Sequence, residues 1–250
     1  MKNRANDRTP ILPVIDLLHG EVVRGVGGRR SEYRPVRSCL TNSSRPLDVA
    51  EAFRETFGFT ELYLADLDAI LGAEPAFEQY ATLRNRGFRL WLDAGVQQLA
   101  DANRLAEAGI ETIVLGLETL REPWEFCRIL REHGPERVVF SLDMKDGKPL
   151  AGNGKWMATD ALELAKWIIH VGGRRLLLLD LASVGGDAGP GSESLCEALA
   201  ASHPDVEIST GGGIRGIDDV KRLQKFGVAN VLVASALHDG RITAAKLRIW

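Results

Sequence analysis

The sequence predicts an α/β protein, a (β/α)8 TIM barrel built from two repeated (βα)4 halves. Three observations predict this fold: eight short and almost continuously apolar runs, amphipathic segments between them, and an internal repeat that relates the two halves of the chain. Strands buried on both faces of a parallel sheet have such continuous apolarity, and a closed barrel needs eight strand–helix units. An open doubly wound sheet is the alternative, but no GxGxxG motif follows the first run.

The strands and helices alternate from one end of the chain to the other. In chain order, the runs predicted to be strands are 11–16, 61–66, 88–93, 111–116, 137–143, 175–180, 206–210 and 229–234. Apolar residues recur at helical spacing between them, most clearly at 46–58, 100–109, 158–173 and 217–227. No linker-like stretch interrupts the alternation, so we expect residues 10–250 to form one barrel domain. The polar residues 1–9 are expected to be a disordered tail.

Three shifts along the chain carry the internal repeat. A shift of 118 residues lays the segment after the third strand over the segment after the seventh, so that Gly95 matches Gly213. A shift of 114 lays residues 63–70 over 177–184, and a shift of 127 lays 13–23 over 140–150. Because the matches follow the same order in both halves, we interpret the chain as two half-barrels of four strand–helix units each.

Composition narrows the class of protein and its partners. The chain has 250 residues, 45% of them hydrophobic and 26% charged, and a formal net charge of −3. These values are typical of a soluble globular protein and argue against a nucleic acid or a membrane surface as partner. Its three cysteines lack CxxC spacing, as expected for reduced thiols, and no run is long enough to span a membrane. With no signal peptide at the polar N-terminus, a cytoplasmic location is expected.

Aspartates mark the expected active site, which in this fold lies at the C-terminal ends of the strands. The runs that end in aspartate do so at Asp16, Asp66, Asp93, Asp143 and Asp180. Any one of them, taken alone, is typical of a helix N-cap. Asp16 and Asp143, however, close strands one and five, which face each other across an eight-stranded barrel, and neither directly precedes a helix. Two carboxylates on opposite walls suit general acid–base catalysis, so we predict both as catalytic.

A glycine-rich loop predicts a phosphate site at the end of strand seven. Gly211, Gly212 and Gly213 stand between that strand and a helix, where backbone N–H groups can approach an anion. Small residues after strand eight, Ala234 and Ser235, leave further donors accessible. The loops after strands seven and eight commonly hold phosphate in barrels, so these five residues are predicted to bind phosphate.

Several segments resemble the HisA/HisF histidine-biosynthesis barrels, and HisA in particular. They are ILPVIDLLHGEVVR, FSLDMK…GKW, STGGGIRGIDDV and VLVASALHDGRIT, and the resemblance covers about residues 11–244. It implies an Amadori rearrangement of an aminoaldose to an aminoketose, on a substrate that carries two phosphates. It also implies that Asp143 is the general acid at the ring oxygen and Asp16 the base at the adjacent carbon, although these roles can exchange. No cofactor is expected, and the scattered histidines predict no metal site.

Further residues are expected at the substrate. The resemblance implies that Trp156 stacks on the substrate's planar ring, the alternative being an ordinary packed aromatic, and that Asp66 supports the site. Arg24, Asp93 and Asp180 are also predicted substrate contacts. The loop 24–37 holds five arginines and is interpreted either as a cover that clamps an anion or as a solvated loop. A lone histidine at the active face, His19, is more typical of local hydrogen bonding.

The chain also departs from the family pattern, which leaves other functions open. Asp93 and Ala94 stand where the family has a second glycine-rich phosphate loop, and Leu117, Leu179 and Val184 replace polar residues. A carboxylate about 4 Å from a phosphate costs on the order of 4 kcal/mol at an effective dielectric of 20. We therefore expect one phosphate, bound at 211–213 and 234–235, with Asp93 facing a neutral or cationic substrate end.

Three hypotheses follow for the function. The first is a HisA-like isomerase acting on a phosphorylated small molecule. The second is a diverged barrel enzyme, isomerase or lyase, that acts on a monophosphorylated substrate of another pathway. The third is a non-catalytic phosphate-binding subunit. In each case the expected assembly is a monomer or a weak homo-oligomer.

Overall fold

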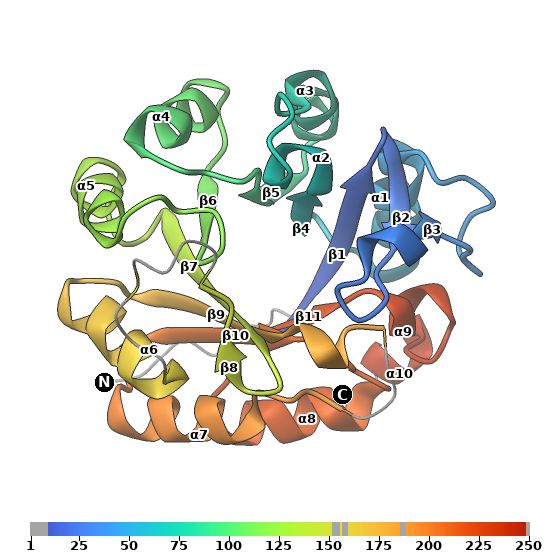
Figure 1. Cartoon of the computed structure of the whole chain (residues 1–250). Coiled ribbons are helices and arrows are strands. Elements are labelled where there is room, and N and C mark those ends of the chain that lie inside the picture. Colours follow the sequence, from blue (N-terminus) through green and yellow to red (C-terminus); the bar gives the residue numbers. More distant parts are fainter. Residues whose placement is uncertain (1–9, 152–155, 157–159, 186–188, 249–250) are drawn as a thin grey trace.

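The computed structural model describes residues 10–151, 156, 160–185 and 189–248 as a closed barrel of parallel strands surrounded by helices (Figure 1). The barrel strands are β1 (Ile11–Leu18), β4 (Glu61–Asp66), β5 (Arg89–Asp93), β6 (Thr112–Gly116), β7 (Val138–Lys145), β9 (Arg175–Asp180), β10 (Glu207–Gly211) and β11 (Asn230–Val233). They pair in this order, and β11 pairs with β1 to close the barrel. This confirms the predicted (β/α)8 fold. The predicted tail 1–9 lies outside the described residues.

Helices form the outer layer of the barrel. They are α1 (Pro46–Phe57), α2 (Leu67–Ile70), α3 (Phe77–Asn85), α4 (Leu99–Glu107), α5 (Pro123–His133), α6 (Ala161–His170), α7 (Glu193–Ser202), α8 (Ile217–Lys225), α9 (Ser235–His238) and α10 (Ala244–Arg248). The helices α1, α4 and α8 begin and end within two residues of the segments predicted from the sequence. Within the described ranges, no helix is both long and apolar enough to cross a lipid bilayer.

Two hairpins lengthen the first and fifth barrel strands, and the sequence analysis did not predict them. The short strands β2 (Glu21–Arg24) and β8 (Lys148–Pro149) pair in antiparallel fashion with β1 and β7. Each hairpin turns through two residues with positive φ, His19–Gly20 and Asp146–Gly147. This backbone suits the twist of a two-residue hairpin turn. The strands β1 and β7 therefore run two residues beyond the predicted ends, and β2 also pairs with β3 (Arg34–Pro35).

The element bounds repeat between the two halves. The shift of 118 residues carries β5 and α4 onto β10 and α8, residue for residue. The shift of 114 carries β4 onto β9, and the shift of 127 carries β1 onto β7. The two hairpin turns also match at the shift of 127, with positive φ at corresponding residues. The predicted construction from two (βα)4 halves is confirmed.

Side chains on alternate strand positions form two separate apolar cores. One lies between the barrel and the helices, and it includes Ile15 and Leu64. The other fills the barrel interior, and it includes Leu12, Tyr63 and Leu177. Because successive side chains of a strand point to opposite faces, one interior residue fixes which of its neighbours also point inward. This alternation determines which of the aspartates at the strand ends face the barrel axis.

A glycine substitution tests the packing at the end of β5. Gly95 has a φ of 66°, and a Cβ there would lie 2.7 Å from the Ile70 Cα and 2.8 Å from the Ala69 carbonyl oxygen. Gly87 also has a positive φ, but a Cβ there would meet nothing within 4 Å. We expect Gly87→Ala to cost about 1 kcal/mol of unfolding free energy for its backbone conformation alone. Gly95→Ala should cost at least about 2 kcal/mol more, because backbone atoms must move.

Urea unfolding of both variants measures the difference. Equal losses in the two variants would contradict the close packing of the loop after β5 against α2.

Candidate functional site

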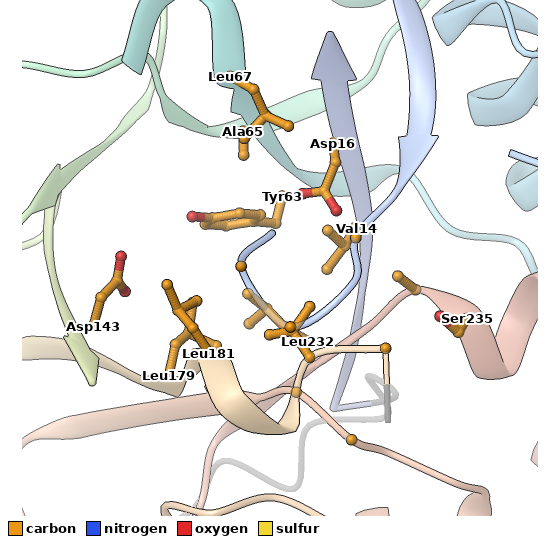
Figure 2. Close-up of a pocket in the computed structure, with 18 of the residues that line it drawn as sticks. Val14, Asp16, Tyr63, Ala65, Leu67, Asp143, Leu179, Leu181, Leu232 and Ser235 are labelled. Carbon is orange, nitrogen blue, oxygen red and sulfur yellow. The ribbon is translucent and has the colours of Figure 1, made fainter. Parts of the chain in front are cut away.

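The barrel opens at the C-terminal ends of its strands into a cavity of about 410 Å³ (Figure 2). Every barrel strand contributes to its wall, either with its last residues or with the loop that follows. Apolar side chains from β1, β4, β9 and β11 line it, namely Val14, Ala65, Leu179 and Leu232. The cavity lies where the fold class predicts an active site.

Three aspartates face this cavity: Asp16, Asp93 and Asp143. Each lies an even number of residues from an interior side chain of its own strand, for instance Asp93 from Trp91, and therefore points inward. In Figure 2, Asp16 and Asp143 stand on opposite sides of Tyr63. The structure thus brings the two predicted catalytic aspartates to one cavity, and Asp93 lines the same cavity.

Burial raises the pKa of all three carboxyl groups. Desolvation alone raises the pKa of Asp16 to about 6. It also raises the pKa of Asp143 to about 6, although a 2.8 Å hydrogen bond from the Ser141 hydroxyl opposes the change. The pKa of Asp93 rises to about 7, first through burial and then through the charge of Asp143. Such values allow a carboxyl group to give up and take up protons near neutral pH.

Tyr63 lies among these aspartates, and the sequence analysis did not single it out. Burial raises its pKa well above the usual value, and the charges of Asp93, Asp143 and Asp16 add to this effect. The proximity of Asp93 raises it further, so the phenol stays protonated. Strand alternation could have identified Tyr63, which corresponds to the apolar Leu177 in the second half. A hydroxyl thus replaces a hydrocarbon at an inward position.

The predicted phosphate loop borders the cavity from another side. Gly212, Gly213, Ala234 and Ser235 line it, but Gly211 does not. A Cβ at Gly211 would lie 2.7 Å from the Leu232 Cβ, so packing explains that glycine. Among the described residues, none accepts a hydrogen bond from the N–H of Gly212 or Gly213. Backbone donors at a cavity wall are the feature that an anion site requires.

In the matching loop after β5, the glycine N–H donates a hydrogen bond within the loop itself. Gly95 and Gly213 correspond in the repeat and have similar φ values of 66° and 69°. The Gly95 N–H, however, donates to the Asp93 carboxylate at 3.2 Å. Ala94 also lacks the positive φ of its counterpart Gly212. The loop after β5 therefore presents a carboxylate to the cavity where its twin presents amides.

Asp66 and Asp180 were expected from the sequence at the substrate, but they lie outside the cavity lining. Each follows an inward residue by one position, so it points away from the barrel axis. Asp66 caps α2 by accepting from the Ala69 N–H at 3.0 Å, and it also accepts from the Tyr80 hydroxyl. Asp180 accepts from the Gly147 N–H at 2.8 Å and so fixes the hairpin turn after β7. Both aspartates hold loops of the site in place.

Trp156 and Arg24 also lie away from the cavity. Trp156 is 6% exposed and packs against Phe140 and Trp167, with ring centroids 5.6 and 5.8 Å away. Because Phe140 is on the outward face of β7, Trp156 belongs to the core between barrel and helices. It is thus a packed aromatic, and the expected stacking on substrate is corrected. Arg24 forms a two-bond pair with Asp239 at 2.8 and 2.9 Å, which occupies its guanidinium.

The loop after β2 covers the cavity. Its Gly27 N–H donates to the Val184 carbonyl at 2.8 Å, which ties the loop to the segment after β9. The short helix η1 (Arg30–Glu32) places Arg30 at the wall, where it pairs with Glu118 at 2.9 Å. Of the five arginines in this loop, Arg30 is the one among the lining residues. His19 is exposed and bonds to Asp68, a local contact.

An Asp93→Asn substitution tests whether burial of the charge costs stability. Because the folded pKa of about 7 exceeds the ordinary 3.8, this carboxyl group favours folding at low pH. That contribution is lost as the pH rises through 7, where the buried group ionises. At pH 8 the variant should gain roughly 2–4 kcal/mol of unfolding free energy over wild type. At pH 5 the gain should be smaller, roughly 1–2 kcal/mol, because only the part of the contribution between pH 3.8 and pH 5 is lost there.

Denaturant titrations at both pH values check this, with the exposed Asp205→Asn as matched control. We expect the control to change stability by less than about 0.5 kcal/mol at either pH. A gain for Asp93→Asn that is the same at pH 5 and pH 8 would contradict a raised pKa at this position.

The comparisons with known proteins agree with one another on the family. The family model described as "Histidine biosynthesis protein" matches residues 10–243, which include all eight barrel strands. An uncharacterised protein of Methanocaldococcus jannaschii is 30% identical over 233 residues, 92% of this chain and 93% of that protein.

Two relatives carry the name 1-(5-phosphoribosyl)-5-((5-phosphoribosylamino)methylideneamino)imidazole-4-carboxamide isomerase. The one from Syntrophomonas wolfei is 30% identical over 242 residues, 93% of this chain and 94% of its own. The one from Parasynechococcus marenigrum is 32% identical over 243 residues, 94% of this chain and 91% of its own.

Proposed function

The chain belongs to the histidine biosynthesis protein family, and we propose that it is an isomerase that converts an aminated aldose phosphate into the aminoketose phosphate. The observation that carries this proposal is the pair of aspartates, Asp16 and Asp143, on opposite walls of one cavity. Two of its relatives are named as isomerases, which supports the reaction class.

The reaction needs one carboxyl group that donates a proton and one that removes a proton. Asp143, when protonated, gives its proton to the ring oxygen of the sugar as the bond from that oxygen to C1 breaks. Asp16, when ionised, takes the proton from C2, and an enolamine forms. Return of a proton to C1 and loss of the hydroxyl proton at C2 complete the ketone. Raised pKa values near 6 suit both transfers.

The rest of the cavity positions the substrate for these transfers. Gly212, Gly213 and Ser235 supply donors for the phosphate at one end. The covering loop with Arg30 excludes water from the reacting centre, which strengthens electrostatic interactions there. A phosphate held at a fixed distance from two opposed carboxyl groups places the sugar ring between them.

The pH dependence of the reaction follows from the two pKa values. As the pH falls below about 6, the base becomes protonated and the rate drops. As the pH rises above about 6, the acid becomes ionised and the rate drops again. We expect kcat/KM to be bell-shaped with its maximum near pH 6, whichever aspartate has which role. A profile that rises steadily to pH 9 would contradict the pair.

Substitution of each aspartate tests its chemical role. Asp16→Asn and Asp143→Asn should each lower kcat by about 10²-fold or more, because amides neither give nor take the proton. Binding of inorganic phosphate should change less than about threefold, since the phosphate loop is untouched. The assay follows conversion of N-substituted 5-phosphoribosylamines in D2O by NMR, starting with the substrate named for the relatives. Product should carry deuterium at C1.

Two results would overturn the proposal. One is that no aldosylamine phosphate in the series is converted by wild-type protein. The other is that both variants keep full activity, which would favour a binding role for the cavity without acid–base chemistry.

A further inference from the structure

The cavity holds two carboxylates more than the proposed reaction uses, Asp93 and Glu118, and Glu118 is paired with Arg30. Asp16 and Asp143 supply the acid and the base, whereas Asp93 has no part in either transfer. Asp93 is only 5% exposed, yet it lines the cavity. A buried carboxylate without a task costs stability, so its presence calls for a ligand that compensates its charge.

Among the described residues, no cationic side chain forms an ion pair with Asp93. Within residues 10–151, 156, 160–185 and 189–248, none of the three cavity aspartates forms a salt bridge, and the cationic side chain of Arg30 pairs with Glu118 instead. In addition, the Asp143 Oδ2 accepts no hydrogen bond from any described residue, although Asp143 is 9% exposed. Buried charges in proteins are normally paired, whereas these carboxylates form no ion pair with a described residue, although Arg30 and Lys145 also line the cavity.

The opposite end of the cavity has the reverse polarity. The amides of Gly212 and Gly213 line it there and favour an anion, and Arg241, which pairs with Asp239 at 3.2 Å, lies at the same end. At the Asp93 end, the corresponding amide of Gly95 is taken up by the Asp93 carboxylate itself. The neutral phenol of Tyr63 lines the cavity as well. One cavity thus combines an anion-binding end and a cation-binding end.

We propose that Asp93 binds a protonated amine of the substrate, and that the substrate is a monophosphate with a cationic far end. This inference rests on the proposed function for the phosphate end, and it sets the substrate apart from the doubly phosphorylated compound named for the relatives. A second phosphate beside Asp93 would meet a like charge in place of free amides, whereas an ammonium group makes charge-assisted hydrogen bonds.

Calorimetric titration with simple probes tests this without knowledge of the true substrate. The probes are a homologous series of aminoalkyl phosphates, the uncharged alkyl phosphates of equal length, and the alkane bisphosphates. At the length that spans the cavity, wild-type protein should bind the aminoalkyl phosphate about tenfold more tightly than the alkyl phosphate. It should bind the bisphosphate less tightly than the aminoalkyl phosphate.

Variants assign the preference to Asp93. Asp93→Asn should bind the aminoalkyl and alkyl phosphates equally, while the exposed Asp205→Asn should keep the tenfold preference. The double variant Asp93→Gly with Ala94→Gly should reverse the preference in favour of the bisphosphate. If that variant does not fold, Asp93→Asn alone decides the question.

The same titrations separate this inference from the proposed function. Inorganic phosphate alone reports on the loop at Gly212 and Gly213, and aminoalkanes without phosphate report on Asp93. If phosphate binds but an amine adds no affinity at any length, the cation end is wrong and the phosphate end stands. If aminoalkanes bind in an Asp93-dependent manner but phosphate does not bind, the proposed function fails and the cation end stands. An amine preference that is unchanged in Asp93→Asn overturns the inference.

Discussion

Closure of the barrel fixes which side chains of every strand point inward, and the rest of the site depends on that alternation. The pairing of β11 with β1 leaves no free edge at which a strand can slip. A slip of one residue would move the whole inward set of a strand to the outer face. Asp16, Asp93 and Asp143 are in phase with the interior residues of their strands, whereas Asp66 and Asp180 are out of phase by one. Aspartates at the C-terminal ends of the strands therefore have two different roles: the inward ones face the cavity, and the outward ones bind neighbouring loops.

The outward aspartates hold in place the loops that lie next to the inward ones. Asp180 fixes the turn at Gly147, directly beyond the end of the strand that carries Asp143. Asp66 anchors α2, and α2 in turn packs against the backbone of Gly95 in the loop that follows Asp93. A catalytic geometry is preserved only when the neighbouring loops are held as firmly as the strands. Hydrogen bonds that do not touch the cavity thus contribute to its shape.

Much of the fold could be predicted from the sequence because a barrel strand buried on both faces is a continuous apolar run. The hairpins after β1 and β7 were missed, although Asp146–Gly147 is a common signal for a two-residue turn. In the site, the pairing of Asp16 with Asp143 followed from strand order alone. The predictions from sequence missed Tyr63 and expected Asp66 and Asp180 at the substrate, because they did not take into account which residues of each strand point inward. The burial of Trp156 depends on contacts with Phe140 and Trp167, which local sequence does not specify.

The two halves of the barrel show where a repeated scaffold is free to diverge. Scaffold positions remain the same in both: Asp101 and Asp219 each accept from the backbone N–H four residues before them, at 3.0 and 2.9 Å. Inward-facing strand positions differ in polarity, as Asp93 does from Gly211 and Tyr63 from Leu177.

Loss of a scaffold contact changes the stability of the whole barrel, whereas a substitution at a cavity position changes how one end of the ligand is bound. The family match rests mainly on the scaffold, since strands and helices make up most of the aligned chain. It therefore carries over the fold, whereas the substrate depends on the few side chains that face the cavity. At Asp93 the chain keeps the loop, its glycine and the following helix, and it changes the charge that the loop presents. A single inward position of this kind is sufficient to change which compound the same catalytic pair acts on.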